Sequence, residues 1–214
     1  MEDNVDVIME NVTTLLSFRD KHATRLGGIL GGLTASVYGL WAVFVFPGFC
    51  KVPWRLRVPF LPSSKAQVQN VMKLLEDRKG RLVDLGSGDG RLVLAAASRG
   101  FQSTGYELNS ILLAYAKTRR WWLGIPANLA TFMKQDLWMA DLSGFSNVTV
   151  FLAPGLVTRI LEKKLKDELP DDARIIVCRF PFTHWPATCS EGSGLDQVWA
   201  YDIQTIKKQL PKSK

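Results

Sequence analysis

The chain has 214 residues, of which 47% are hydrophobic and 22% are charged, and its formal net charge is +7. This length suits one domain with an appendage, and this hydrophobic content can supply a core. Three cysteines without a C-x-x-C spacing imply neither a disulfide framework nor a zinc site. The charge excess does not require a nucleic-acid-binding face, because residues 204–214 hold four lysines and no acid, whereas residues 60–203 hold 17 basic and 15 acidic residues. We therefore expect neither a metal nor a nucleic-acid partner.

The N-terminal part changes composition abruptly. Residues 1–25 form a tail whose first ten positions hold four acids and no base, unlike an Arg-rich cleavable presequence. An uncharged run of 25 residues follows, from Leu26 to Cys50. A helix over its first 21 residues would be about 32 Å long, the thickness of a bilayer core, and Pro47 would end it. We expect residues 26–47 to be an uncleaved transmembrane anchor in the lipid bilayer, with a flexible stretch or a buried soluble helix as alternatives.

A folded domain is expected over residues 63–203, after a Pro-rich, basic linker at residues 48–62. Its first helix begins at Ser64, which forms a predicted capping box with Gln67, and Gly80 closes it.

Residues 82–91, LVDLGSGDGR, combine an apolar, β-prone run with a glycine-rich turn, and a helical pattern follows. Strand, tight loop and helix in this order are typical of the opening of a doubly wound α/β sheet. Glycines allow backbone dihedrals that other residues avoid and let a ligand approach closely. The helix beyond the loop is expected to offer free N–H groups.

Two cofactor classes use such a loop. A dinucleotide fold requires G-x-G-x-x-G, but Arg91 occupies the third glycine position, and the pattern here is G-x-G-x-G. Asp84 precedes the first glycine and Asp89 lies inside the loop. A carboxylate close to a diphosphate is repelled by roughly 4 kcal/mol per pair, whereas the same carboxylates suit a cation. S-adenosylmethionine carries a sulfonium and an ammonium and no phosphate, so charge favours it over NAD; a glycine-rich turn without ligand is the remaining alternative.

Two further acids follow expected strands. Glu107 ends a second apparent strand, where an acid can accept hydrogen bonds from both ribose hydroxyls of a bound nucleoside. Asp136 follows a short third strand and is expected to accept from the adenine amino group, although a surface or turn role is the alternative.

The rest of the domain alternates between strands and helices. A helix at 111–124 ends in Arg119-Arg120-Trp121-Trp122, of which we expect one Trp in the core and one on the surface, with an interfacial belt as the alternative. The remaining predicted elements are a strand at 148–152, a helix at 158–169, strands at 173–178 and 197–203, and a basic tail at 204–214.

The segment after the strand at 173–178 is rich in aromatic residues. Apolar side chains can form the walls of a narrow channel, and by desolvating an ammonium group they favour its deprotonation. Phe180, Phe182 and Trp185 are the expected walls. His184 is expected to be a structural hydrogen-bonding residue, and no catalytic base is assigned.

Three motifs together resemble the seven-strand methyltransferase superfamily: DLGSGDG at 84–90, YELN at 106–109 and QDLW at 135–138. More narrowly, with VPFLP at 58–62, RFPF at 179–182 and VWAYD at 198–202, they resemble the mitochondrial protein-lysine methyltransferases that modify the adenine nucleotide translocase and the ATP synthase c subunit. The sequences at 47–49, 55–59 and 150–154 look closer to the translocase branch.

This resemblance implies a seven-strand Rossmann-like α/β methyltransferase domain on a single membrane anchor, with S-adenosylmethionine as cofactor. The expected cofactor-binding residues are Asp84, Gly86, Ser87, Gly88, Gly90, Glu107, Asp136 and Leu137. The implied substrate is a lysine of a membrane-embedded protein, the adenine nucleotide translocase, in the mitochondrial inner membrane, with the catalytic domain facing the matrix. The alternatives are methylation of the ATP synthase c subunit, an NAD(P)-dependent oxidoreductase, a non-catalytic membrane scaffold, and a small-molecule or lipid methyltransferase.

Overall fold

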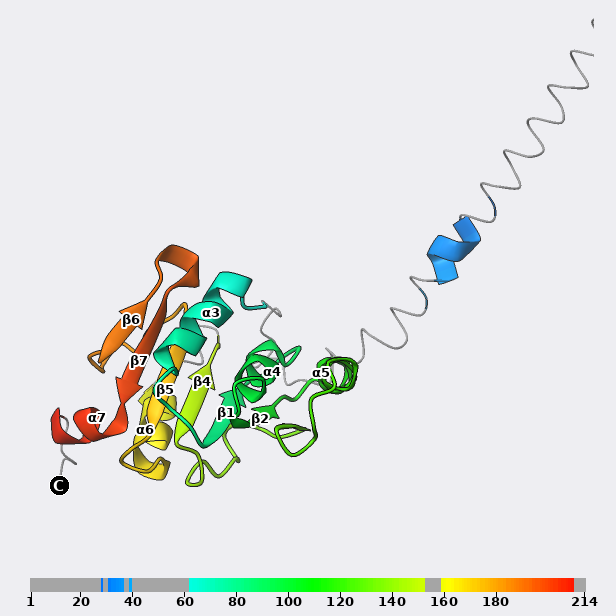
Figure 1. Cartoon of the computed structure of the whole chain (residues 1–214). Coiled ribbons are helices and arrows are strands. Elements are labelled where there is room, and N and C mark those ends of the chain that lie inside the picture. Colours follow the sequence, from blue (N-terminus) through cyan, green and yellow to red (C-terminus); the bar gives the residue numbers. More distant parts are fainter. Residues whose placement is uncertain (1–27, 29–30, 37–38, 40–61, 153–158, 210–214) are drawn as a thin grey trace, which may run out of the picture. The chain divides into compact units, whose positions relative to one another are not determined.

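The structure is a computed structural model that describes residues 28, 31–36, 39, 62–152 and 159–209 (Figure 1). It divides the chain into two units, residues 1–50 and 51–214. In the first unit, residues 31–36 are helical and exposed, and most of the expected anchor lies outside the described residues. The helices that are described include none with both the length and the apolar character needed to cross a bilayer.

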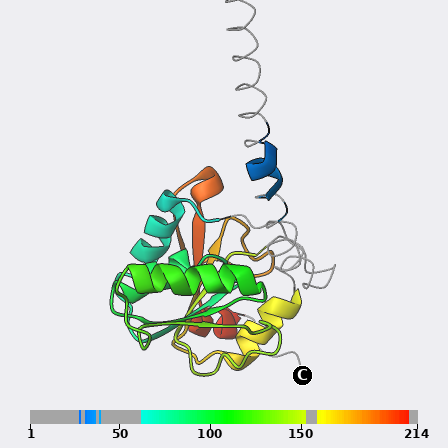
Figure 2. The same cartoon turned by 90° about the vertical axis from the view of Figure 1, so that its right-hand side faces the viewer.

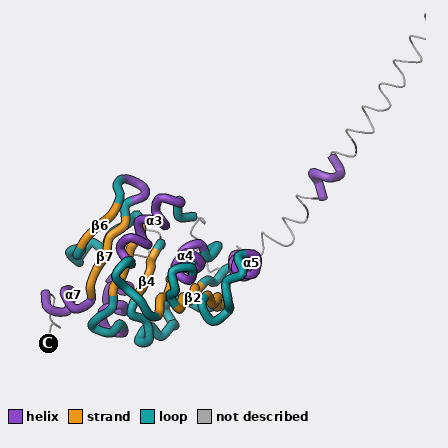
Figure 3. Tube along the Cα trace, in the orientation of Figure 1, coloured by secondary structure: helices purple, strands orange, loops and turns teal. Residues whose placement is uncertain are grey.

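The second unit is built on a seven-stranded sheet in the order β3-β2-β1-β4-β5-β7-β6 (Figures 1 and 3). The first five strands are parallel, while β7 runs antiparallel to both β5 and β6. The order reverses direction between β1 and β4, and ligands of open α/β sheets bind at such a switch point. The strand bounds are β1 Arg81–Leu85, β2 Gln102–Tyr106, β3 Ala130–Met133, β4 Asn147–Val150, β5 Arg174–Cys178, β6 Cys189–Glu191 and β7 Val198–Asp202.

Helices cover both faces of this sheet. One face packs against α3, α4 and α5 in two apolar clusters, and the other face packs against α6 and α7 in a third. Helices on both faces explain why nearly every residue of β1, β4 and β5 is buried. The predicted α/β architecture is therefore confirmed. The helix bounds are α3 Lys65–Leu74, α4 Arg91–Ala97, α5 Ser110–Trp122, α6 Arg159–Glu168 and α7 Ile203–Gln209.

The cap of α3 differs from the predicted capping box. Ser64 Oγ accepts the Gln67 N–H at 3.0 Å, as expected, but Gln67 Nε2 donates to the Leu195 carbonyl at 3.2 Å instead of returning to the cap. Ser64 Oγ also donates to Asp196 at 2.6 Å. The second hydrogen bond of the capping box is therefore absent, and Ser64 and Gln67 instead bond to the segment before β7 and hold α3 against it.

The expected burial of one tryptophan at the end of α5 is wrong. Trp121 is 76% exposed and Trp122 is 78% exposed. The buried face of α5 consists of Leu113 and Ala116, which lie on the opposite side of the helix. Strand β6 was not predicted, because it is three residues long and contains no apolar alternation.

Gly90 lies where the start of α4 meets β3 and α5. Its φ is +77°, and a Cβ atom there would lie 2.6 Å from the Phe132 ring and 2.9 Å from Ala116 Cβ. Gly100 has a similar φ of +89° but no atom within 4 Å of its Cβ position. Comparing alanine substitutions at the two glycines therefore distinguishes the cost of backbone strain from the cost of steric crowding.

We predict that Gly90→Ala lowers the free energy of unfolding more than Gly100→Ala does. Both substitutions carry the left-handed backbone cost of about 1–2 kcal/mol, and Gly90→Ala adds an overpacking cost of about 1–3 kcal/mol. Urea unfolding followed by circular dichroism measures both variants. Equal losses of stability would contradict the close approach of β3 and α5 to the loop.

Candidate active site

The predicted site residues lie at one edge of the sheet. The loop 86–90 follows β1, Glu107 follows β2, and Asp136 comes three residues after β3. These three strands are neighbouring and parallel, so their carboxyl ends meet at the same edge (Figure 1). The structure thus brings the three segments to the switch point.

Hydrogen bonds to β2 and the residue after it hold the glycine loop. The N–H groups of Gly86 and Ser87 both donate to the Tyr106 carbonyl, at 3.0 and 2.9 Å. The Gly88 N–H donates to Glu107 Oε2 at 2.9 Å, and the Gly90 N–H donates to the Ser87 carbonyl at 2.8 Å. Four of the five N–H groups of the loop thus donate within the protein, which leaves few of them for a diphosphate.

One of the N–H groups expected to be free at the start of α4 already has a partner. The first of these groups, on Arg91, donates to Asp89 Oδ1 at 3.3 Å. The same carboxylate is paired with Arg91 Nη2 at 2.7 Å and with Arg119 Nη1 at 3.0 Å. The Asp89 carboxylate is thus already paired with two guanidinium groups, so it is less available to a cationic ligand than Asp84 is.

Asp84 is the buried acid of the site, with 2% of its surface exposed. In register it lies between Gly105 of β2 and Thr149 of β4, and the Thr149 hydroxyl donates to its Oδ1 at 2.7 Å. Burial raises the pKa of Asp84 to about 7; the Thr149 hydrogen bond lowers it, and the charges of Glu107 and Asp89 raise it further. An acid that titrates near neutral pH at a switch point is a candidate functional group.

Cys178, at the end of β5, is also buried. Burial raises the pKa of its thiol strongly, and the charge of Asp84 adds to this rise. The thiol is protonated at neutral pH, so it is not a nucleophile. Within the part of the chain that the structure describes, no group of three His, Cys, Asp or Glu residues is placed to hold a metal ion.

Glu107 has capacity for a ligand. Its Oε2 accepts from Gly88 N and its Oε1 accepts from Asn109 N at 2.7 Å. A carboxylate offers about four acceptor positions, so each oxygen retains one. The side chain is held in place by two backbone donors while it keeps acceptors for a diol.

The other predicted residues are placed less favourably. Asp136 Oδ1 accepts from the Trp138 N–H at 3.0 Å, and Leu137 is partly buried against the core on the α6 face. The Ser87 hydroxyl is buried and has no hydrogen-bond partner among the described residues. It lies 2.6 Å from the position that a Cβ on Gly105 would occupy, so it points toward β2. The Ser87 side chain is therefore packed against β2.

The aromatic segment after β5 contributes less to the site than expected. Phe182 and Trp185 are 4% and 6% exposed, and their rings pack with Tyr201 in the core, with centroid distances of 4.8 to 6.3 Å. Their predicted role as channel walls is wrong, because both rings are buried in the core. Phe180 is half-buried and remains a candidate wall.

His184 is held between two charged residues of α6, as expected of a structural hydrogen-bonding residue. Arg159 Nε donates to His184 Nε2 at 3.1 Å, and His184 Nδ1 lies 3.1 Å from Glu162 Oε2. Since Arg159 donates to Nε2, the ring proton belongs on Nδ1 and is donated to Glu162. His184 is thus engaged on both nitrogens.

Sequence reasoning missed two residues of this edge. Thr149 carries a hydroxyl group inside the fully buried strand β4, and a polar side chain in such a strand is a usable signal. Arg179 has a φ of 67°, and the Phe180 N–H donates to the Cys178 carbonyl at 2.8 Å, which is a γ-turn. Positive φ at a non-glycine residue is strained and clusters at functional sites, but nothing in the amino-acid pattern announces it.

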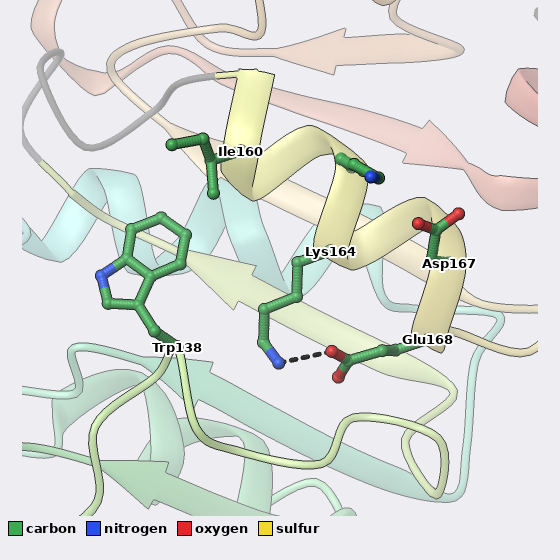
Figure 4. A pocket seen from close by; sticks show the side chains of 6 residues that line it. Trp138, Ile160, Lys164, Asp167 and Glu168 are labelled. Atoms are coloured by element: carbon green, nitrogen blue, oxygen red, sulfur yellow. Dashed lines mark hydrogen bonds and ion pairs between the residues drawn. The ribbon is translucent and has the colours of Figure 1, made fainter.

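A separate surface hollow of about 430 Å³ lies along α6 (Figure 4). Trp138 and Ile160 form its apolar side, while Lys164 is paired with Glu168 at 2.6 Å. None of the predicted cofactor residues lines it. The hollow therefore lies apart from the predicted cofactor residues.

The raised pKa of Asp84 predicts a pH dependence of stability in the ligand-free protein. The folded state binds its proton more tightly than the unfolded state, so the stabilisation is fully present below the unfolded pKa of 3.8 and is lost as pH rises through about 7. We expect the free energy of unfolding to fall by up to about 1.4 kcal/mol per pH unit in this window.

Urea unfolding of the wild type and of Asp84→Asn across this window checks the prediction. The decline should vanish in Asp84→Asn and persist in the control Asp171→Asn, whose side chain is 76% exposed. The same decline in all three proteins would show that Asp84 is not its source.

The sequence of this chain matches known protein families. Residues 84–189 match the ANTKMT methyltransferase domain, and residues 19–53 match the ANTKMT N-terminal domain. The human lysine N-methyltransferase named for the ATP synthase c subunit is 47% identical over 85% of this chain and 76% of its own length. The mouse adenine nucleotide translocase lysine N-methyltransferase is 46% identical over 80% of this chain and 75% of its own length.

The fold is also found among solved structures. An RNA methyltransferase from Salinibacter ruber, crystallised with S-adenosyl-L-homocysteine, has a TM-score of 0.62 and 29% identity, covering 67% of this chain and 94% of that one. The family match overturns the oxidoreductase alternative and the non-catalytic scaffold. The chain belongs to the ANTKMT family and is an S-adenosylmethionine-dependent protein-lysine N-methyltransferase.

Proposed function

We propose that the chain methylates a lysine of the adenine nucleotide translocase in the mitochondrial inner membrane, and that the switch-point acids hold its cofactor. The proposed cofactor-binding residues are Asp84, Gly86, Ser87, Gly88, Gly90, Glu107, Asp136 and Leu137. The observation that carries the proposal is the buried Asp84 carboxyl, whose pKa of about 7 leaves it ready to ionise beside a cation. A dinucleotide diphosphate would find repulsion there instead.

Each proposed contact uses a group with spare capacity. Glu107 accepts from the ribose hydroxyls with the lone pairs that Gly88 and Asn109 leave available. Asp136 accepts from the adenine amino group with Oδ2, since Oδ1 is taken by Trp138 N. The glycines let the adenosyl group approach the backbone, and Leu137 supplies an apolar contact.

The bound cofactor supplies an electrophilic methyl group. The chain must orient the lysine amine in line with it and keep that amine neutral. A lysine starts near pKa 10.4, so apolar surroundings that disfavour the ammonium promote deprotonation. Phe180 is the residue we propose for this surface, while His184, held by Glu162 and Arg159, is not assigned as a base.

The substrate is inferred from relatives and from the N-terminal segment. The two relatives named for the translocase and for the ATP synthase c subunit differ by one per cent in identity, so identity does not choose between the substrates. The translocase-like sequences at 47–49, 55–59 and 150–154 favour the first, and the c subunit is the second candidate. The family resemblance implies that either substrate lies in mitochondria.

We further propose that residues 26–47 form a single transmembrane anchor, between a tail at 1–25 and a linker at 48–62, with the catalytic domain at 63–203 facing the matrix and a basic tail at 204–214. The family's N-terminal domain matches residues 19–53, so the uncharged run is part of a family segment. An anchor in the same membrane raises the effective concentration of the substrate.

Mass spectrometry of lysine methylation in mitochondrial membranes tests this function. Cells lacking the protein should lose methylation of the translocase, and wild type or the exposed-site control Asp171→Asn should restore it. Asp84→Asn should restore less than a tenth, because a neutral amide no longer complements the cationic cofactor. Loss of methylation on the ATP synthase c subunit with an unchanged translocase would contradict the proposed substrate while leaving the cofactor site standing.

A further inference from the structure

Helix α5 has two apolar faces, and one of them is exposed. The inner face packs Leu113 and Ala116 against α4 and β3. At 100° per residue, the outward residues fall within a stripe of about 120°. These residues are Ile111, Ala114, Tyr115, Thr118, Trp121 and Trp122.

The exposure of this stripe is large. Tyr115 is 54% exposed, Trp121 76% and Trp122 78%, and Leu123 beyond the helix is 60% exposed. In Figure 2, α5 runs across the side of the domain that faces the viewer, in front of the strands. The 13 residues of α5 extend for about 20 Å, so the stripe is available along a whole helix.

The charged residues of α5 itself are all basic. Residues 108–135 hold four basic residues and no acid. Lys117 lies exposed at the border of the stripe, and Arg120 is held at the helix end by the Ala130 carbonyl at 3.0 Å. Arg119 pairs with Asp89 and lies on the other border. A surface that combines Trp and Tyr rings with basic residues complements an anionic, partly apolar partner.

We propose that α5 is a membrane-contact surface, whose Tyr115, Trp121 and Trp122 rings enter the headgroup region of an anionic bilayer. Trp and Tyr are favoured at this depth because their rings are apolar and their polar atoms stay hydrated. Basic residues beside them are attracted to anionic headgroups.

A second copy of the chain is a poorer occupant. A two-fold contact through α5 would bring the basic residues of both copies together, and this helix has no acid to compensate them. A lipid surface of opposite charge meets no such penalty.

This contact goes beyond the proposed anchor, because it orients the domain. Asn109 caps the start of α5 and donates its N–H to Glu107, so the helix begins at the cofactor edge of the sheet. A helix that lies along the bilayer would hold that edge close to the membrane surface, where a membrane-embedded substrate presents its lysine.

Quenching of tryptophan fluorescence by phospholipids brominated in their acyl chains tests the contact. The full chain carries Trp41→Phe and Trp54→Phe, so that only domain tryptophans report. It is reconstituted in vesicles of phosphatidylcholine alone or with equimolar phosphatidylglycerol. We expect quenching in the anionic vesicles to fall more than twofold in Trp121→Ser/Trp122→Ser and to fall also in Lys117→Glu.

The matched control is Met139→Ser/Leu195→Ser, which removes two other exposed apolar side chains, 79% and 68% exposed, and should leave quenching unchanged. Thermal melting confirms that each variant is folded. Equal quenching in the tryptophan double variant and its parent overturns the inference. A parent protein that is dimeric, with a double variant that is monomeric, also overturns it. Retention of all variants in alkaline-washed membranes would show that the anchor proposal stands apart from this result.

Discussion

The burial of Asp84 at the end of β1 is the constraint on which the site depends. A carboxylate removed from water is costly unless it is neutralised or paired, and the Thr149 hydroxyl supplies only one hydrogen bond. The protein meets this cost by raising the pKa of Asp84 to about 7. Asp89, five residues further along the chain, is also buried, but its carboxylate is stabilised by ion pairs with two arginines. Asp84, in contrast, has no cationic partner among the described residues, and this is why we propose it as the acid that receives the cationic cofactor.

Hydrogen bonds hold the glycine loop beside Asp84 in one conformation. Backbone donors of Gly86 and Ser87 converge on the Tyr106 carbonyl, and Gly88 binds Glu107. One side chain therefore ties β1's loop to the end of β2 while keeping acceptors for a ligand. Such pre-organisation lowers the conformational cost of binding. The lack of Cβ atoms at Gly90 and Gly105 lets β3, α5 and Ser87 approach closely.

Patterns with a single physical cause were predictable from the sequence. The apolar runs that became β1, β4 and β5 are buried on both faces, and the spacing of Asp84, Glu107 and Asp136 follows from three successive parallel strands. Predictions failed where tertiary partners decide. Arg119 lies 30 residues from Asp89, so the pairing of that acid is invisible locally. Phe182 and Trp185 are aromatic residues of the kind that line a channel, but their rings pack against Tyr201 in the core.

The central claim is that an ionised Asp84 receives a cationic cofactor, and calorimetric titration with S-adenosylmethionine across a pH series tests it most directly. Binding should favour ionised Asp84 and release its proton, so affinity should rise by up to about tenfold per pH unit below pH 7 and level off above it. Asp84→Asn should bind weakly with no such rise. An affinity independent of pH in the wild type, with equally tight binding by Asp84→Asn, would contradict the account.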